Sequence, residues 1–162
     1  MTRFELIVEW VDRAADDRSP VGILGARAAF PEAGMALVDY LEGRFVALEE
    51  RLAIEHSPLW WELLLLLAET WLPEERDAFL TRVVLRGGTP GCYRWIAAFV
   101  KVAFSADEVE PSLLAGLESP DPMTRDNARV LAYYLLDDAY RLSDAGEAKR
   151  QALGAQAPSA SL

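Results

Sequence analysis

Apolar residues recur every three or four positions along most of the chain, and this spacing predicts amphipathic helices. Prolines, often preceded by serine, interrupt the pattern at short intervals, as expected where helices begin. No alternating run of β-branched residues predicts a strand. The predicted fold is therefore all-α, a compact stack of eight or nine antiparallel helices joined by short turns. The predicted helices cover residues 3–16, 20–30, 32–54, 59–71, 73–86, 92–104, a segment capped by Ser105 or Asp107 and ending at 117, 123–142, and 144–153.

These helices are expected to form a single domain over residues 1–153, followed by a disordered tail at 154–162. The most apolar run, 59–68, is about half of the roughly 20 residues that span a bilayer, so it predicts a buried central helix. The N-terminal sequence lacks the pattern of a signal peptide. A single cysteine excludes an internal disulfide and fits a reducing compartment, which predicts a cytoplasmic protein.

The chain has a net charge of −10, and its two flanks are the acidic parts. Residues 1–73 contain 13 acidic and 6 basic residues, residues 101–162 contain 10 and 6, and the segment between them is nearly neutral. This charge disfavours nucleic acid and anionic membranes as partners. One interpretation is that the acids serve solubility. The other is an acidic face that binds a basic protein.

For the second interpretation, the predicted contact residues combine acids of the C-terminal flank with two adjacent tryptophans, a residue enriched among binding hot spots. The two tryptophans point about 100° apart on a helix, so both are buried only if that helix is covered on two sides. Core packing is their alternative role. The predicted partner-binding residues are Asp107, Glu108, Glu110, Asp137, Asp138, Trp60 and Trp61.

The segment 111–136 (PSLLAGLESPDPMTRDNARVLAYYLL) consists of a predicted helix, a Ser-Pro-Asp-Pro turn and a second helix. The leucine pair Leu113-Leu114, the Asp-Pro turn and the arginine near the start of the second helix resemble a HEAT repeat, although Thr124 stands where valine is usual. In that family the turn aspartate and the helix arginine, here Asp121 and Arg125, stabilise the turn and have no catalytic role. The resemblance implies a HEAT-like α-solenoid, with an orthogonal bundle as the alternative. It also implies binding of other proteins along a concave face; a minority of the family binds nucleic acid.

The sequence contains few groups suited to catalysis. The single histidine, His56, and the single cysteine, Cys92, are 36 residues apart without a flanking motif, so a packed cysteine is the simpler interpretation than a nucleophile. Glu62 and Glu69 share a helix face and are interpreted as its solvent-facing stripe. The glycines of 87–91 lack the Gly-Lys-Ser/Thr ending of a phosphate loop. Neither a metal nor a cofactor is predicted.

The expected function is therefore a non-enzymatic protein–protein interaction module, monomeric or homodimeric, with a basic protein as partner and no role for nucleic acid or membrane. Small acidic helical proteins of this build resemble bacterial immunity proteins, which block a toxin by covering its active site. The alternative is an enzyme or small-ligand receptor with an aromatic cavity lined by Trp60, Trp61, Trp95 and Phe99.

Overall fold

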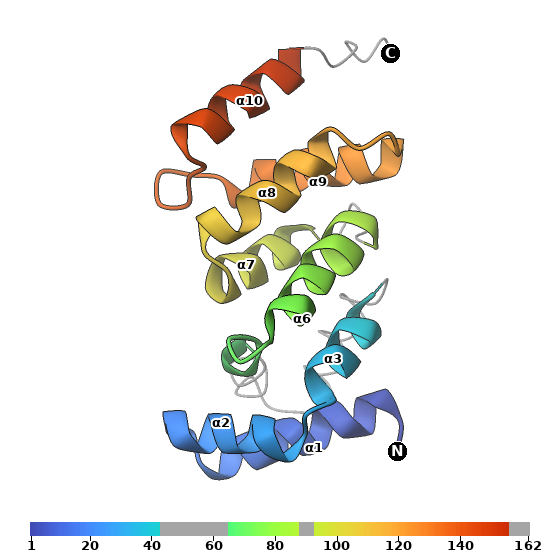
Figure 1. Ribbon diagram of the computed structural model, residues 1–162, viewed down its shortest axis with the longest axis vertical. Helices are drawn as coiled ribbons and strands as arrows, with labels where there is room; N and C mark the ends of the chain where they lie inside the picture. The colour runs from blue at the N-terminus through green and yellow to red at the C-terminus, as the bar shows by residue number, and fades with distance from the viewer. Residues whose placement is uncertain (43–64, 88–92, 156–162) are drawn as a thin grey trace.

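The computed structural model describes residues 1–42, 65–87 and 93–155, and its helices form an elongated stack (Figure 1). All regular elements in these ranges are helical, which confirms the predicted all-α class with eight or nine helices. The nine helices of the described ranges are α1 (Arg3–Asp16), α2 (Pro20–Ala29), α3 (Ala33–Leu41), α6 (Pro73–Ala78), η1 (Phe79–Arg86), α7 (Tyr93–Ala103), α8 (Ala106–Leu117), α9 (Pro122–Leu135) and α10 (Asp144–Ala155).

The helices follow one another along the long axis of the molecule. α1 and α2 pack together at the N-terminal end, α3 rests on α1, and α6 with η1 forms the middle (Figure 1). α8 and α9 form a pair above α7, and α10 lies against α8 at the C-terminal end. A continuous hydrophobic core connects α1 to α9, with Trp10, Phe79 and Phe99 among its largest buried side chains. The stack therefore has two ends that no described helix covers.

Side-chain caps fix the starts of several helices. The Ser19 hydroxyl accepts a hydrogen bond from the Gly22 amide, and Ser105 likewise accepts one from the Glu108 amide. Such caps satisfy amide groups that have no partner within the helix. Ser19 was predicted as a cap from its Ser-Pro pair, and of the two predicted alternatives for the later helix, Ser105 and Asp107, the structure uses Ser105.

The predicted helix 73–86 is helical but not uniform. Its second half, η1, is a π-helix, in which hydrogen bonds join residues five apart. This wider winding lets residues four and five apart share one face, and Phe79, Val83 and Val84 are all buried. Two side chains close its C-terminal end: the Tyr93 hydroxyl donates to the carbonyl of Val84, and the Asn127 amide donates to that of Leu85.

The prediction that one helix extends from 123 to 142 is wrong, because α9 ends at Leu135. The Asp137 carboxylate accepts hydrogen bonds of 2.9 Å from the amides of Ala139 and Tyr140 and so holds a turn. A short polar side chain that bonds nearby amides competes with helix continuation. The Tyr140 hydroxyl then donates to the Phe104 carbonyl, which anchors this turn to the end of α7.

The remaining predicted boundaries lie within or beside the described ranges. α3 covers the first part of the predicted helix 32–54, residues 65–68 are helical at the end of the predicted helix 59–71, and α10 extends two residues past the predicted 153. Residues 43–54 and 59–64 of these two predicted helices lie outside the described residues, as do His56 and Cys92, and residues 69–71 are not helical. None of the described helices is by itself long and apolar enough to span a membrane; α2 and α3 reach that length only together and are bent by 82°.

Candidate functional site

The five acidic residues predicted to bind a partner divide into two groups. Three of them contact other parts of the chain: Glu108 pairs with Arg76, Asp137 pairs with Lys101, and Glu110 accepts two hydrogen bonds of 2.6 Å from the amide and hydroxyl of Ser143. Asp107 and Asp138 are exposed. The structure therefore uses most of this predicted acidic surface to fix the ends of its own helices.

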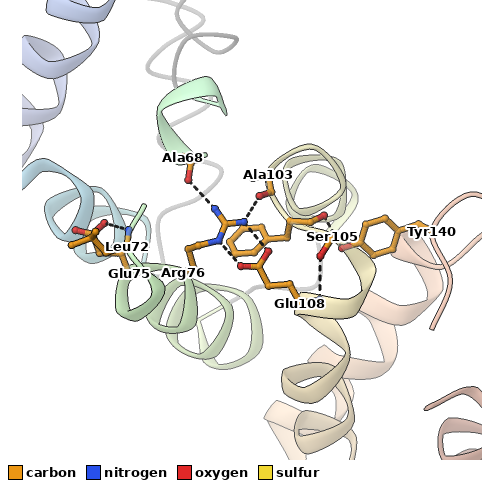
Figure 2. Close-up of polar contacts among 9 residues, drawn as sticks. Ala68, Leu72, Glu75, Arg76, Ala103, Ser105, Glu108 and Tyr140 are labelled. Carbon is orange, nitrogen blue, oxygen red and sulfur yellow. Dashed lines mark hydrogen bonds and ion pairs between the residues drawn. The ribbon is translucent and has the colours of Figure 1, made fainter. Parts of the chain in front are cut away.

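Arg76 connects four segments of the stack (Figure 2). Its guanidinium binds the Glu108 carboxylate at the start of α8 through two nitrogens, and it also donates to the carbonyls of Ala68 and Ala103. Those carbonyls lie at the ends of two helical segments, where backbone acceptors often lack a full set of partners, although the Ala68 carbonyl also accepts from the Trp71 amide. The guanidinium carbon is 4.4 Å from the ring centroid of Phe104. Arg76 therefore joins α6, α7, α8 and the helical turn before α6.

The ion pair of Arg76 and Glu108 makes the stability of the fold depend on pH. The hydrogen bond from Arg76 is the main cause that lowers the pKa of Glu108 below its ordinary value. A lowered pKa in the folded state means that the carboxylate stabilises the fold above its unfolded pKa, and that this stabilisation is lost as the pH falls through the folded value. We expect the midpoint of urea unfolding to fall between pH 5 and pH 3, and to fall less in Glu108→Gln. An equal decline in both proteins would contradict a role for Glu108.

Asp121 is the N-cap of α9, and Arg125 lies in the first turn of that helix, beside the connection from α8. The Asp121 carboxylate accepts hydrogen bonds from the amide and hydroxyl of Thr124, at 2.9 and 2.6 Å, and Arg125 donates to the carbonyls of Ser119 and Pro120. All of these contacts join residues 119–125, so both side chains stabilise the connection between α8 and α9. Membership in the HEAT family stays a prediction.

A groove of 790 Å³ lies beside this turn, between α6–η1 and α8. Its surface combines two aspartates and one arginine with small or uncharged side chains, and so it has no strong preference for one charge. The lining residues are Asp77, Thr81, Leu85, Arg86, Pro111, Ser112, Ala115, Gly116, Ser119, Pro120, Asp121 and Thr124.

Aromatic rings fill the described part of the predicted aromatic cavity. Phe99 lies 5.2 Å from Phe79 and 6.0 Å from Trp71, measured between ring centroids, and Phe79 stacks on Phe104. This packing leaves Phe99 in the hydrophobic core. Trp60 and Trp61 lie outside the described residues, and the side chain of Trp95 is not described either.

The other residues considered for chemistry are dispersed. Glu69 is exposed beside the start of α6, and Glu62 lies outside the described residues. Within residues 1–42, 65–87 and 93–155, no three His, Cys, Asp or Glu side chains are grouped as metal ligands.

The N-terminal end of the stack carries a surface that was not among the predicted sites. On α2, apolar residues at 21, 24, 25 and 28 lie three and four apart and are exposed, with Val21 78% and Leu24 62% accessible. Residues at this spacing share one face of a helix. In stacked helical arrays the outermost layer usually presents a polar face. An exposed apolar face at such an end is therefore a departure from the usual pattern.

Acidic residues lie on the neighbouring helix. The buried face of α1 consists of Ile7, Trp10, Val11 and Ala14, and the opposite, exposed face carries a stripe of carboxylates. The stripe consists of Glu5, Glu9, Asp12 and Asp16. Glu5 also caps the start of α1 with Thr2.

The sequence did contain the signals for this surface. The carboxylates at 5, 9, 12 and 16 follow the helical repeat, and so do the apolar positions of α2. An apolar stripe on a helix normally predicts the face that packs on the core. The spacing alone therefore does not show that this stripe of α2 is exposed. Only the packing of α2 at the end of the stack identifies its stripe as exposed.

No family model matches the chain, and no curated protein or solved structure matches it significantly.

Proposed function

We propose that the protein is a non-enzymatic protein-binding module and that its contact surface is the N-terminal end layer formed by α1 and α2. The observation that carries this proposal is the exposed apolar stripe on α2, with Val21 and Leu24 at its centre. Apolar side chains that are exposed together, beside polar ones, are typical of protein–protein contact sites. A stack of helices with no clustered reactive groups in its described part is suited to presenting such a surface.

The charge of α1 determines the kind of partner. An interface commonly has an apolar centre and a polar rim, and the rim charges steer association toward a surface of opposite sign. The carboxylates of α1 would form one rim of the α2 stripe, so a basic protein is the fitting partner. An inhibitory role of the kind that bacterial immunity proteins perform belongs to this proposal, as does a cytoplasmic location. The same carboxylates disfavour an anionic membrane.

Affinity capture tests the proposal. The purified chain is used as bait in a lysate of its native host, and bound proteins are quantified by mass spectrometry for wild type, Val21→Glu and Leu24→Glu. Each substitution places a charge in the centre of the stripe, and we expect the partner to be lost at least tenfold in both variants, because an unpaired charge at a buried interface is costly.

The matched control is Val102→Glu, because Val102 is also an exposed valine, 57% accessible, but lies on α7. This variant should retain the partner, and circular dichroism should show that all three variants are folded. Retention of the same partner by both α2 variants would refute the end layer as the contact surface.

A further inference from the structure

A second surface feature lies at the opposite end of the stack, in the pocket between α9 and α10. The pocket has a volume of 410 Å³, within the range of small-molecule sites. Side chains from three helices line it, together with Leu136 just beyond α9. The lining residues are Leu117, Arg129, Ala132, Tyr133, Leu136, Arg150, Leu153 and Gly154.

The charge of this lining is opposite to that of the whole chain. It contains two arginines and neither an aspartate nor a glutamate, although the chain has 26 acidic residues. Arg129 and Arg150 come from different helices, α9 and α10. An anion in the pocket would therefore meet two cations from two sides.

Arg150 is held through two nitrogens, Arg129 makes one exposed hydrogen bond, and both guanidinium groups retain free donors. Glu147 accepts from Nε and Nη2 of Arg150 at 2.9 and 2.6 Å, and Asp126 accepts from Nη1 of Arg129 at 3.2 Å. A guanidinium has five N–H donors, so each arginine keeps at least three for a ligand. A cation that is already oriented loses less conformational entropy when it binds. The two carboxylates lie outside the lining.

The rest of the lining is apolar. Leu117, Ala132, Leu136 and Leu153 provide aliphatic surface, and the ring of Tyr133 is 79% exposed at the edge. A small ion such as inorganic phosphate would leave the apolar part of the lining exposed to water. A ligand that uses the whole pocket needs an apolar body as well as a negative charge.

We propose that the pocket between α9 and α10 binds an organic anion, a carboxylate or sulfonate attached to an aliphatic or aromatic body. The apolar body contacts the leucines and Tyr133, and the acid group accepts hydrogen bonds from Arg129 and Arg150. This site is separate from the end layer proposed for protein binding, and each proposal can fail without the other.

The test uses 8-anilinonaphthalene-1-sulfonate as the probe, since it combines a sulfonate with an aromatic body and fluoresces when it enters an apolar site. N-phenyl-1-naphthylamine, which lacks the sulfonate, measures the contribution of the apolar surface alone. We expect the wild-type chain to bind the sulfonate about tenfold more tightly than the neutral compound, and inorganic phosphate not to compete. Equal affinity for the two compounds would overturn the proposal.

Two sets of variants locate the binding. Arg129→Gln and Arg150→Gln should each weaken sulfonate binding by about tenfold and leave binding of the neutral compound unchanged. The control is Arg13→Gln, at an exposed position of α1, which should leave the binding of both compounds unchanged. Gly154→Glu should abolish sulfonate binding, because a Cβ atom at Gly154 meets nothing within 4 Å and Gly154 lines the pocket, so the new carboxylate can reach the arginines. Ala152→Glu adds the same charge to the same helix at an exposed position outside the lining and should bind like wild type.

Loss of the folded state would not imitate these results, because partly unfolded proteins bind this probe more strongly, not less. Unchanged sulfonate binding in Gly154→Glu and in both arginine variants would show that the probe binds elsewhere, for example on the apolar stripe of α2, and would refute the site.

Discussion

Arg76→Met is expected to lower the free energy of unfolding by about 3 kcal/mol, because it breaks a partly buried ion pair at the centre of the stack. The substitution keeps the length and much of the apolar volume of the side chain. It removes the charge that pairs with Glu108 and the donors that satisfy the carbonyls of Ala68 and Ala103. The Glu108 carboxylate and the Ala103 carbonyl then lose their Arg76 partner at a partly buried junction, where each such loss costs about 1–3 kcal/mol, and the Ala68 carbonyl retains only its bond from the Trp71 amide.

Urea unfolding followed by circular dichroism measures this effect, and Arg129→Met is the matched control. Arg129 also pairs with a carboxylate, Asp126, but both side chains are largely exposed, so the control should change the stability by less than about 1 kcal/mol. The double variant Arg76→Met/Glu108→Met should be less destabilised than the sum of its single changes, because no unpaired charge remains. Equal effects of Arg76→Met and Arg129→Met would show that the junction contributes nothing beyond a surface pair.

Gly25→Glu is expected to stabilise the fold and at the same time to abolish binding of the protein partner. Gly25 lies inside α2, and a Cβ atom there meets nothing within 4 Å. Replacing a helix-interior glycine with a good helix former contributes about 0.5–1 kcal/mol. The new carboxylate, however, lies in the apolar stripe between Leu24 and Ala28 and would be buried without a partner in the complex. Opposite signs for stability and binding cannot result from misfolding.

Gly25→Ala separates the two effects. It should raise the unfolding temperature by a similar amount and retain the partner, because alanine keeps the stripe apolar and adds only a methyl group. Thermal unfolding and the same affinity capture are the two measurements. If Gly25→Glu retains the partner, the α2 stripe is not the contact surface.

The helices that could be predicted correctly are those whose limits depend on neighbouring residues. α1 has the predicted bounds, and Ser19 and Ser105 cap the helices that follow them, because a cap acts over three residues and is visible in the sequence. The end of α9 was predicted wrongly because the apolar spacing continues from Leu135 to Leu142. The turn of Asp137 overrides that spacing, since it is anchored on α7 through Tyr140 and Lys101.

The candidate sites depend on distant contacts, which explains why the sequence indicated them only in part. The acidic character of the surface follows from composition. Glu108 and Arg76 are 32 residues apart, and Glu110 and Ser143 are 33 apart, so no local pattern indicated that these acids form contacts within the fold. The exposed apolar face of α2 depends on its place at the end of the stack. The pocket of Arg129 and Arg150 depends on how α10 rests on α8.

The attachment of α10 has a consequence for the ends of the molecule. None of its residues belongs to the hydrophobic core; Ser143, just before its first residue, binds Glu110, and Lys149 pairs with Glu118 at 3.1 Å. Exposed polar contacts of this kind are weak and are screened by salt. We therefore expect α10 to open at a lower free energy than the helices that the hydrophobic core joins. A ligand that contacts both Arg129 and Arg150 would bind only when α10 is docked. Ligand binding would therefore raise the free energy of opening α10, and weak docking of α10 would lower the apparent affinity for the ligand.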